Sequence, residues 1–320
     1  MSKVSIIIPC YNAGEYILNT VRCCLEQSYK NLEIILVNDG STDHTWELLK
    51  TLPCDYTNIH VFSTENKGAS LARKFGLQKA SGEFVFFVDA DDEIKRDAIE
   101  LLVKKQQIHD YDIVVGQHEI FKKNRVFLGR AHRAEGDSQI VNVRNILINQ
   151  YPIFLWGQLY RKSLLEKVEF YDFTVGEDMV INTQLMLFPE IKVSFIEEVV
   201  YKYVINNSSL SQSKSSEKTA EGISAHKKMI ELINKVVDSR FIRSELAHNY
   251  LNLLYALIIL KDSESLNIRN LIKKEFPNEY TNVLNSFGWK RKSILKVYIM
   301  FPGCAAFIYG FFSKWLLQKT

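Results

Sequence analysis

The sequence lacks the glycine-rich motifs with which two large enzyme classes hold phosphate groups. No G-x-G-x-x-G follows its first apolar run, and no G-x-x-x-x-G-K-[ST] occurs in its 320 residues. These absences argue against a dinucleotide-dependent enzyme and against a P-loop NTPase. A nucleotide bound by this chain would need its phosphate charge neutralised in another way, by a metal ion or by basic side chains.

Cysteine is scarce and shows no metal-binding spacing. The five cysteines form no C-x-x-C pair and have no histidine at the distance of a zinc site. Reduced thiols in a cytosolic protein explain them best. No signal peptide opens the sequence, because its first three residues run directly into an apolar strand pattern. We therefore expect the catalytic part to be cytoplasmic.

Charge of either sign is present without a large excess. The 40 Lys and Arg against 37 Asp and Glu leave a net charge of +3, which is too small to indicate a nucleic-acid partner. A hydrophobic content of 47% excludes wholesale disorder. At about 150 residues per domain, the length suits one large domain with a helical addition.

The first 100 residues alternate between strand and helix patterns. Apolar runs predict strands at Val4–Ile8, Leu32–Val37, Ile59–Phe62 and Phe84–Val88. Apolar residues at helical spacing lie between these runs, which gives the order β-α-β-α-β-α-β. This order predicts an α/β fold with a parallel sheet and right-handed crossovers.

Polar residues follow these strands at the ends where open α/β sheets bind ligands. The segments at these ends contain Pro9, Tyr11, Asn12, Asp39, Asp89, Ala90 and Asp91. The carboxylates after the fourth strand would repel one another without a cation. We expect Mg²⁺ or Mn²⁺ on Asp91, since a hard cation suits one or two carboxylates with phosphate oxygens. The alternative is a solvated turn in which Asp92 caps the next helix.

Four motifs occur in order over about the first 100 residues. They are Pro9-x-Tyr11-Asn12, Val37-Asn38-Asp39-Gly40-Ser41-x-Asp43, Glu65-Asn66-x-Gly68-x-x-x-Ala72-Arg73 and Asp89-Ala90-Asp91-Asp92. Together they resemble family-2 glycosyltransferases of the GT-A fold, a Rossmann-like, mainly parallel sheet flanked by helices. The resemblance implies a nucleotide-sugar donor and a divalent metal. One departure is Lys74, where the family often has Asn.

The resemblance also implies roles for single residues. Tyr11 would stack on the base, Asp39 would hydrogen-bond the base, and Asp89 would lie near the ribose. Asp91 would bind the metal at the diphosphate. Arg73, through two hydrogen bonds from its guanidinium group, and Lys67, through its positive charge, would help to neutralise the phosphates. The remaining expected donor-site residues are Pro9, Asn12, Asn66 and Ala90.

Two later segments are expected to serve the acceptor. Trp156 lies in a stretch that resembles the segment leading to the acceptor site; it is either a core residue, the commoner fate of Trp, or a flat platform for a sugar. Glu177 and Asp178 open an apolar-periodic helix, where plain capping is one interpretation. The resemblance implies that Asp178 is the general base for an acceptor hydroxyl, with Glu177 as the second candidate or an acceptor-orienting residue.

The functional alternatives for two polar loops stay open. Residues 129–138 contain Arg130, His132 and Arg133, and they form either a solvated loop or a loop that closes over a diphosphate or a charged acceptor. Residues 205–211 resemble a loop that closes on the donor, but their Asn and Ser content also suits an ordinary turn.

We expect a catalytic domain over residues 1–212 and a helical region over 213–320. Helices are predicted at Ala220–Asp238, Phe241–Lys261 and Ser265–Leu284. Residues 287–320 combine a basic cluster with an apolar run shorter than the roughly 20 residues that cross a bilayer. Flanking Trp, Lys and Arg favour an element in the membrane interface; a buried hairpin or a homodimer interface is the alternative.

These observations predict an inverting, metal-dependent glycosyltransferase at the cytoplasmic face of the membrane, held there peripherally. Its donor would be a UDP-sugar, by resemblance, and its acceptor a lipid-linked or growing surface glycan. One alternative is a sugar-nucleotide nucleotidyltransferase, whose glycine-rich N-terminal loop is missing. The other is a non-catalytic assembly subunit, against which Asp39, Asp91 and Asp178 argue.

Overall fold

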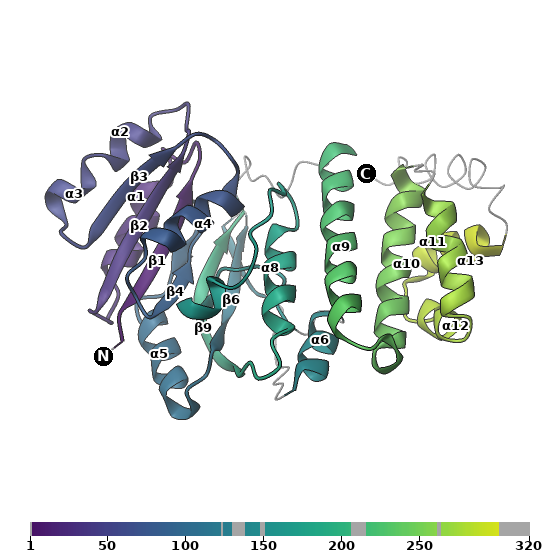
Figure 1. Ribbon diagram of the computed structural model, residues 1–320. Helices are drawn as coiled ribbons and strands as arrows, with labels where there is room; N and C mark the ends of the chain where they lie inside the picture. Colours follow the sequence, from purple (N-terminus) through teal and green to yellow (C-terminus); the bar gives the residue numbers. More distant parts are fainter. Residues whose placement is uncertain are drawn as a thin grey trace. The chain divides into compact units, whose positions relative to one another are not determined.

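A computed structural model of the chain describes residues 2–122, 124–129, 138–147, 151–205, 216–260 and 264–300. The chain divides into two compact units, Met1–Ser213 and Lys214–Thr320 (Figure 1). Each unit has its own cluster of buried apolar side chains.

A mainly parallel sheet forms the centre of the first unit (Figure 1). Its strands are β1 (Val4–Cys10), β2 (Leu32–Asp39), β3 (Ile59–Thr64), β4 (Phe84–Phe87), β5 (Glu93–Ile94), β6 (Ile113–Lys122), β7 (Arg125–Leu128), β8 (Gln158–Arg161) and β9 (Val193–Val204). Their order is β3-β2-β1-β4-β8-β6-β9-β5, with β7 beside β6. The first four strands are mutually parallel, which confirms the predicted α/β order, whereas β8 is antiparallel to both β4 and β6.

Helices flank this sheet, as the sequence predicts. They are α1 (Ile17–Leu25), α2 (Thr45–Leu49), α3 (Leu52–Asp55), α4 (Ala69–Lys79), α5 (Ala98–His109), α6 (Gln139–Leu147), α7 (Lys162–Leu165) and α8 (Glu177–Met186). Ile6 and Ile8 of β1 join the main core cluster, while Ile7 faces α4, where a Cβ on Gly76 would come within 2.5 Å of it. Both faces of β1 are therefore covered, which explains its uninterrupted apolar sequence.

The strand order reverses between β1 and β4, because β2 and β3 lie on the other side of β1. Ligands of open α/β sheets bind at the carboxyl ends of strands beside such a position. Pro9 lies inside β1 and does not end it, contrary to the expected boundary at Ile8. Proline has no backbone N–H to donate. At position 9 this N–H would point towards β4, but the pairing of β1 with β4 already ends at Ile7 and Phe87, so no hydrogen bond of the sheet is lost.

The loop after β4 is tied to β9 by a buried aspartate. Asp92 accepts hydrogen bonds from the Tyr201 hydroxyl at 2.8 Å and from the Val204 N–H at 2.7 Å. The same hydroxyl accepts a bond from the Asp89 N–H at 3.1 Å. The alternative in which Asp92 caps the next helix is wrong, because Asp97 occupies the N-cap position of α5.

The second unit is helical. It contains α9 (Ser216–Val236), a short 3₁₀ turn η2 (Ser239–Phe241), α10 (Arg243–Leu260), α11 (Ser265–Glu275), α12 (Glu279–Leu284) and α13 (Trp289–Met300). The single helix expected over Ser265–Leu284 is two helices. Pro277 lies between them, and it lacks the N–H that a continuing helix would need.

The first part of the predicted membrane element is a packed helix. α13 buries Ile294, Leu295, Tyr298 and Ile299 in the core of its unit, so these apolar side chains are not available to a lipid surface. Residues 301–320 lie outside the described part of the chain, as do Arg130, His132 and Arg133 and residues 206–211. Within the residues that are described, no helix is long and apolar enough to cross a membrane.

Glu33 joins the amino ends of β1, β2 and β4, at the opposite end of the strands from the predicted site. Its carboxylate accepts hydrogen bonds from the Ser5 hydroxyl at 2.5 Å, Lys3 Nζ at 2.6 Å and the Ser81 N–H at 2.7 Å. Burial alone would raise the pKa of Glu33, but these hydrogen bonds outweigh that effect and lower the pKa to about 2.

We predict that Glu33→Gln lowers the free energy of unfolding by about 2 kcal/mol at neutral pH. Because the folded pKa lies below the ordinary value of 4.5, this contribution is present above pH 4.5 and is lost as the pH falls towards 2. Urea unfolding at several pH values measures the effect, with the exposed Glu15→Gln as the matched control. A gap between wild type and Glu33→Gln that stays constant down to about pH 2.5 would exclude ionisation of Glu33 as the cause.

Candidate active site

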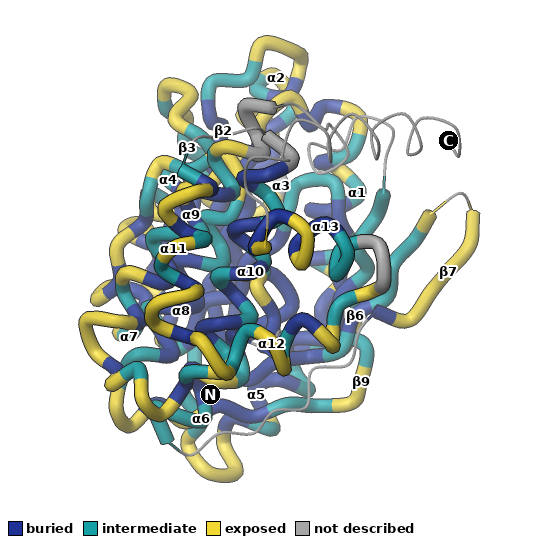
Figure 2. Tube along the Cα trace, turned by 90° about the vertical axis from the view of Figure 1, so that its right-hand side faces the viewer, coloured by how far each residue is buried: buried dark blue, intermediate teal, exposed yellow. Residues whose placement is uncertain are grey.

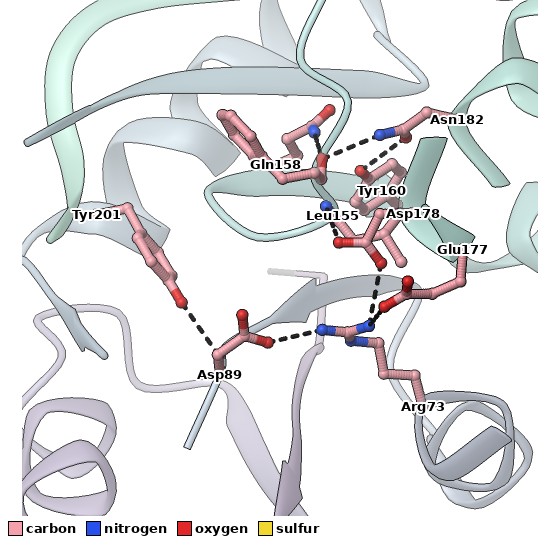
Figure 3. Close-up of polar contacts among 10 residues, drawn as sticks. Arg73, Asp89, Leu155, Gln158, Tyr160, Glu177, Asp178, Asn182 and Tyr201 are labelled. Atoms are coloured by element: carbon pink, nitrogen blue, oxygen red, sulfur yellow. Dashed lines mark hydrogen bonds and ion pairs between the residues drawn. The ribbon is translucent and has the colours of Figure 1, made fainter. Parts of the chain in front are cut away.

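A buried arginine joins three carboxylates from distant parts of the sequence (Figure 3). Arg73 lies on α4, Asp89 follows β4, and Glu177 and Asp178 open α8. Arg73 Nη2 donates to Asp89 Oδ1 at 2.7 Å, and Nη1 donates to Asp178 Oδ1 at 3.0 Å and to Glu177 Oε1 at 3.3 Å. The structure therefore places the predicted base and a predicted donor residue on one cation.

The burial of Arg73 alters the role expected from the sequence. Arg73 is only 4% exposed, and both of its terminal nitrogens are engaged by protein carboxylates. A buried cation among acids serves first to balance their charge, because an unpaired buried charge is costly. A donor diphosphate could bind the guanidinium group of Arg73 only by displacing those carboxylates. In this structure the group is therefore not available to a donor.

The local sequence explains how the two acids of α8 reach Arg73. Gly176 has φ +87°, a left-handed conformation that favours glycine, and it turns the chain into the helix. Glu177 and Asp178 then occupy the first helical turn, where the helix dipole stabilises negative charge. The second oxygen of Asp178 accepts a hydrogen bond from the Leu155 N–H at 3.2 Å.

Burial raises the pKa of both acids of α8. For Glu177, loss of hydration and then the charge of Asp178 raise the pKa to about 8, against the opposing effect of Arg73. Burial likewise raises the pKa of Asp178, again opposed by Arg73. At neutral pH Glu177 is therefore mostly protonated. A carboxylate whose pKa is raised towards the working pH is a better general base than an ordinary one.

The buried side-chain amide of Asn182 holds the segment that carries the Leu155 N–H. Asn182 of α8 donates to the carbonyls of Phe154 at 2.9 Å and Pro152 at 3.2 Å, and it accepts a bond from the Tyr160 hydroxyl at 3.1 Å. Asn182 is not among the site residues expected from the sequence. Its only signal was a polar residue on the buried side of an apolar helix. Tyr201, which supports Asp89 and Asp92, lies in an apolar strand and gave no signal.

Trp156 is a core residue and not an exposed platform. It is 8% exposed and belongs to the main core cluster. Its ring stacks on Phe154 at 3.6 Å, on Tyr201 at 4.5 Å and on Tyr203 at 5.6 Å between centroids. Because so little of the side chain is exposed, the acceptor role expected for Trp156 does not fit its packing.

Tyr11 and Asn12, two of the predicted donor residues, lie in the loop at the carboxyl end of β1. Tyr11 is 47% exposed, as a ring that stacks on a ligand would have to be. Asn12 has φ +49°, and its side-chain oxygen accepts bonds from the Thr42 N–H at 2.8 Å and the Asp43 N–H at 3.3 Å. Asn12 therefore fastens the loop after β1 to the loop after β2.

Asp39 organises a third loop. Its carboxylate is buried and accepts hydrogen bonds from the Lys67 N–H at 2.9 Å and the Gly68 N–H at 2.8 Å. The side chains of Asn66 and Lys67 in this loop are exposed. The contact expected between Asp39 and a base would use the acceptor capacity that these two bonds leave.

The acids after β4 suit a divalent cation in part. Asp91 is half-buried, and Ala90 binds the Thr20 hydroxyl through its carbonyl at 2.9 Å. Burial, followed by the charges of Asp89 and Asp91, raises the pKa of Asp92, which disfavours a further negative charge beside these two acids. Mg²⁺ accepts one carboxylate completed by phosphate oxygens, and this donor set fits such an ion. In the described part of the chain no group of three or more His, Cys, Asp or Glu could hold a metal by itself.

Comparison with known proteins gives a family and a fold. The sequence profile "Glycosyl transferase family 2" matches residues 5–169. The glycosyltransferase GlyA of Streptococcus pneumoniae serotype 4 is 34% identical over 220 residues, which are 66% of this chain and 32% of GlyA. The chain thus matches only about a third of the length of that relative.

Two solved structures share the architecture. S. aureus TarS 1–349 in complex with UDP-GlcNAc aligns over 93% of this chain and 87% of its own, with 20% identity and a TM-score of 0.67. The mannosyltransferase PcManGT of Pyrobaculum calidifontis, in complex with GDP-Man and Mn²⁺, aligns over 98% of this chain and 88% of its own, with 17% identity and a TM-score of 0.58. At these identities the likeness shows the fold, and it confirms the predicted GT-A architecture.

We predict that Glu177→Gln is tolerated, because a neutral amide resembles the protonated acid. The pKa of Glu177 is about 8 in the folded protein and 4.5 ordinarily. The free energy of unfolding therefore decreases as the pH rises between these two values, because the unfolded chain ionises first. The variant should therefore be more stable than wild type by about 1 to 3 kcal/mol at pH 8 and nearly equal to it at pH 4.5. Urea unfolding at both pH values decides; a variant that is less stable at pH 8 would show that Glu177 is ionised in the folded protein.

We predict that Arg73→Gln lowers the free energy of unfolding by about 3 to 5 kcal/mol, since it leaves buried carboxylates without their cation. Adding Asp89→Asn removes one of those charges and should restore at least about 1 kcal/mol. Lys104→Gln, which removes an exposed cation from the same unit, is the control. If the double variant is no more stable than Arg73→Gln alone, charge balance is not what Arg73 provides.

Proposed function

The chain belongs to glycosyl transferase family 2, and on that basis we propose that it transfers a sugar from a nucleotide-sugar donor to a hydroxyl group with inversion at the anomeric carbon. One observation carries the proposal. Buried Arg73 joins Asp178, the proposed base, to Asp89 in the proposed donor loop. A single-displacement transfer requires the base and the donor to lie close together, and the bonds of Arg73 bring these two residues together.

In the proposed reaction Asp178 takes the proton of the acceptor hydroxyl as its oxygen attacks the anomeric carbon. The bond from that carbon to the nucleotide oxygen breaks, and the nucleoside diphosphate leaves with the electron pair. A single displacement inverts the configuration and needs no enzyme nucleophile. Arg73 and the Leu155 N–H hold the two oxygens of Asp178, which fixes the direction in which the carboxylate receives the proton.

The proposed cofactor is Mg²⁺ or Mn²⁺, held by Asp91 and by phosphate oxygens of the donor. When bound, such an ion stabilises the negative charge that grows on the leaving diphosphate. The half-buried position of Asp91 in the loop after β4 supports a cation at this loop. The Mn²⁺ in the PcManGT complex supports the same choice.

The proposed donor is a UDP-sugar. Support comes from the UDP-GlcNAc bound to TarS, which shares the fold, and from the exposed ring of Tyr11 at the carboxyl end of β1. The side chain of Lys67 is exposed beside Asp39 and would contribute positive charge near the phosphates. The GDP-Man bound to PcManGT shows that this fold accepts other nucleotides. The identity of the donor's nucleobase therefore needs a direct binding test.

The proposed acceptor is a lipid-linked or growing surface glycan, reached by peripheral association with the cytoplasmic face of the membrane. Support for the location is the pairing of basic and apolar residues near the end of the sequence. Part of that apolar sequence is buried in α13, and the remainder lies outside the described residues.

We predict that Asp178→Asn lowers the transfer rate by about 10³-fold, because an amide cannot take the proton. Binding of UDP in the presence of Mn²⁺, measured by calorimetry, should change little. Asp91→Asn should instead weaken that metal-dependent binding, and the exposed Asp110→Asn should alter neither quantity. Loss of UDP binding in Asp178→Asn would mean that this residue holds the donor and is not the base.

A further inference from the structure

The hairpin formed by the end of β6 and by β7 exposes apolar side chains on both of its faces. Val126, Phe127 and Leu128 are 56%, 50% and 67% exposed. Successive residues of a strand point to opposite faces, so Val126 and Leu128 lie on one face of the hairpin and Phe127 on the other. Figure 2 shows β7 as a strand that is exposed along its length.

The hairpin extends beyond the neighbouring strand of the sheet. β8 pairs only with Ile113–Val115 of β6, whereas β7 pairs antiparallel with the later residues Glu119–Lys122. In the described part of the first unit no strand pairs with the outer edge of β7. Natural edge strands are usually protected by charge, proline or short length. Three consecutive exposed apolar residues on such an edge therefore indicate a binding surface.

The charge around this hairpin is positive and unbalanced. Lys122 and Arg125 are exposed and lie directly opposite each other in the ladder, an arrangement that is unfavourable unless an anion is near. Neither forms an ion pair with a described residue. The one acid in β6 and β7 is Glu119, and Lys95 binds it at 2.5 Å. The sequence from residue 121 to residue 134 contains no Asp or Glu.

We propose that the tip of this hairpin, residues Lys122 and Arg125–Leu128, binds the surface of an anionic lipid bilayer. A protein partner usually covers one face of a ribbon or adds a strand to its edge. A bilayer interface instead surrounds an inserted tip, so it covers both apolar faces at once. Lipid phosphates and carboxylates would then neutralise the opposed cations. The inference rests on the proposed function, because a lipid-linked acceptor lies in such a surface.

Sedimentation of the full-length protein with vesicles tests the proposal. Vesicles of phosphatidylcholine alone are compared with vesicles that also contain phosphatidylserine. Wild type should bind the anionic vesicles more tightly, and added salt should weaken the binding. The triple change Val126→Ser, Phe127→Ser, Leu128→Ser should weaken binding about tenfold or more. The pair Lys122→Gln, Arg125→Gln should remove the preference for anionic lipid.

Matched controls separate the hairpin from general hydrophobicity. Ile108→Ser and Leu18→Ser also remove exposed apolar side chains, 61% and 49% exposed, from the first unit. Neither should alter vesicle binding. All the changes are at exposed positions, and the thermal midpoint of each variant verifies that it is folded. Equal vesicle binding by wild type and the triple variant would overturn the proposal, as would wild type that does not bind anionic vesicles.

Two further readouts separate this proposal from its alternatives. If the triple variant changes the oligomeric state in light scattering while vesicle binding is unchanged, the hairpin binds a second copy of the chain and the lipid proposal is wrong. Hydrolysis of the UDP-sugar in solution, without vesicles, reports on the proposed function alone. Hairpin-dependent vesicle binding by a chain that shows no turnover would support the lipid surface and reject the enzyme.

Discussion

The ion cluster around Arg73 is the interaction on which the site depends. Negative charges placed this close would repel one another, and burying them without a cation would be costly. Arg73 meets that requirement with bonds to Asp89, Glu177 and Asp178. Because these residues lie on α4, after β4 and on α8, the same interaction fixes the helices and the loop to one another. The same contacts therefore balance the charge of the acids and assemble the site.

Several residues expected to contact a ligand also hold the protein together. Asn12 fastens the loop after β1 to the loop after β2, and Asp39 holds the backbone of Lys67 and Gly68. Such bonds keep the carboxyl ends of β1 and β2 in place before a ligand arrives. A site prepared in this way loses less conformational entropy on binding. The residue types that resemble a donor site are thus also those that the fold needs to build it.

The sequence predicted the first 100 residues well because parallel strands buried on both faces leave uninterrupted apolar runs. It also identified the acids of the candidate site. It could not identify the partners of Arg73, because Glu177 and Asp178 lie 104 and 105 residues further along the chain. The burial of Trp156 could not be predicted either, because nothing in the sequence distinguishes a stacked core tryptophan from an exposed one. Only the packing of Phe154 and Tyr201 on its ring decides between them.

The same limit explains why two apolar segments have opposite roles. The apolar residues of α13 share one side of a helix and pack into the core of their unit, so a sequence that resembles a membrane element contributes to folding. The apolar residues of β7 alternate between two faces of a narrow hairpin, and none of the described layers of the first unit covers either face. Hydrophobicity in a sequence therefore shows that a segment needs a covering surface. The surrounding topology determines whether the protein itself or a partner provides it.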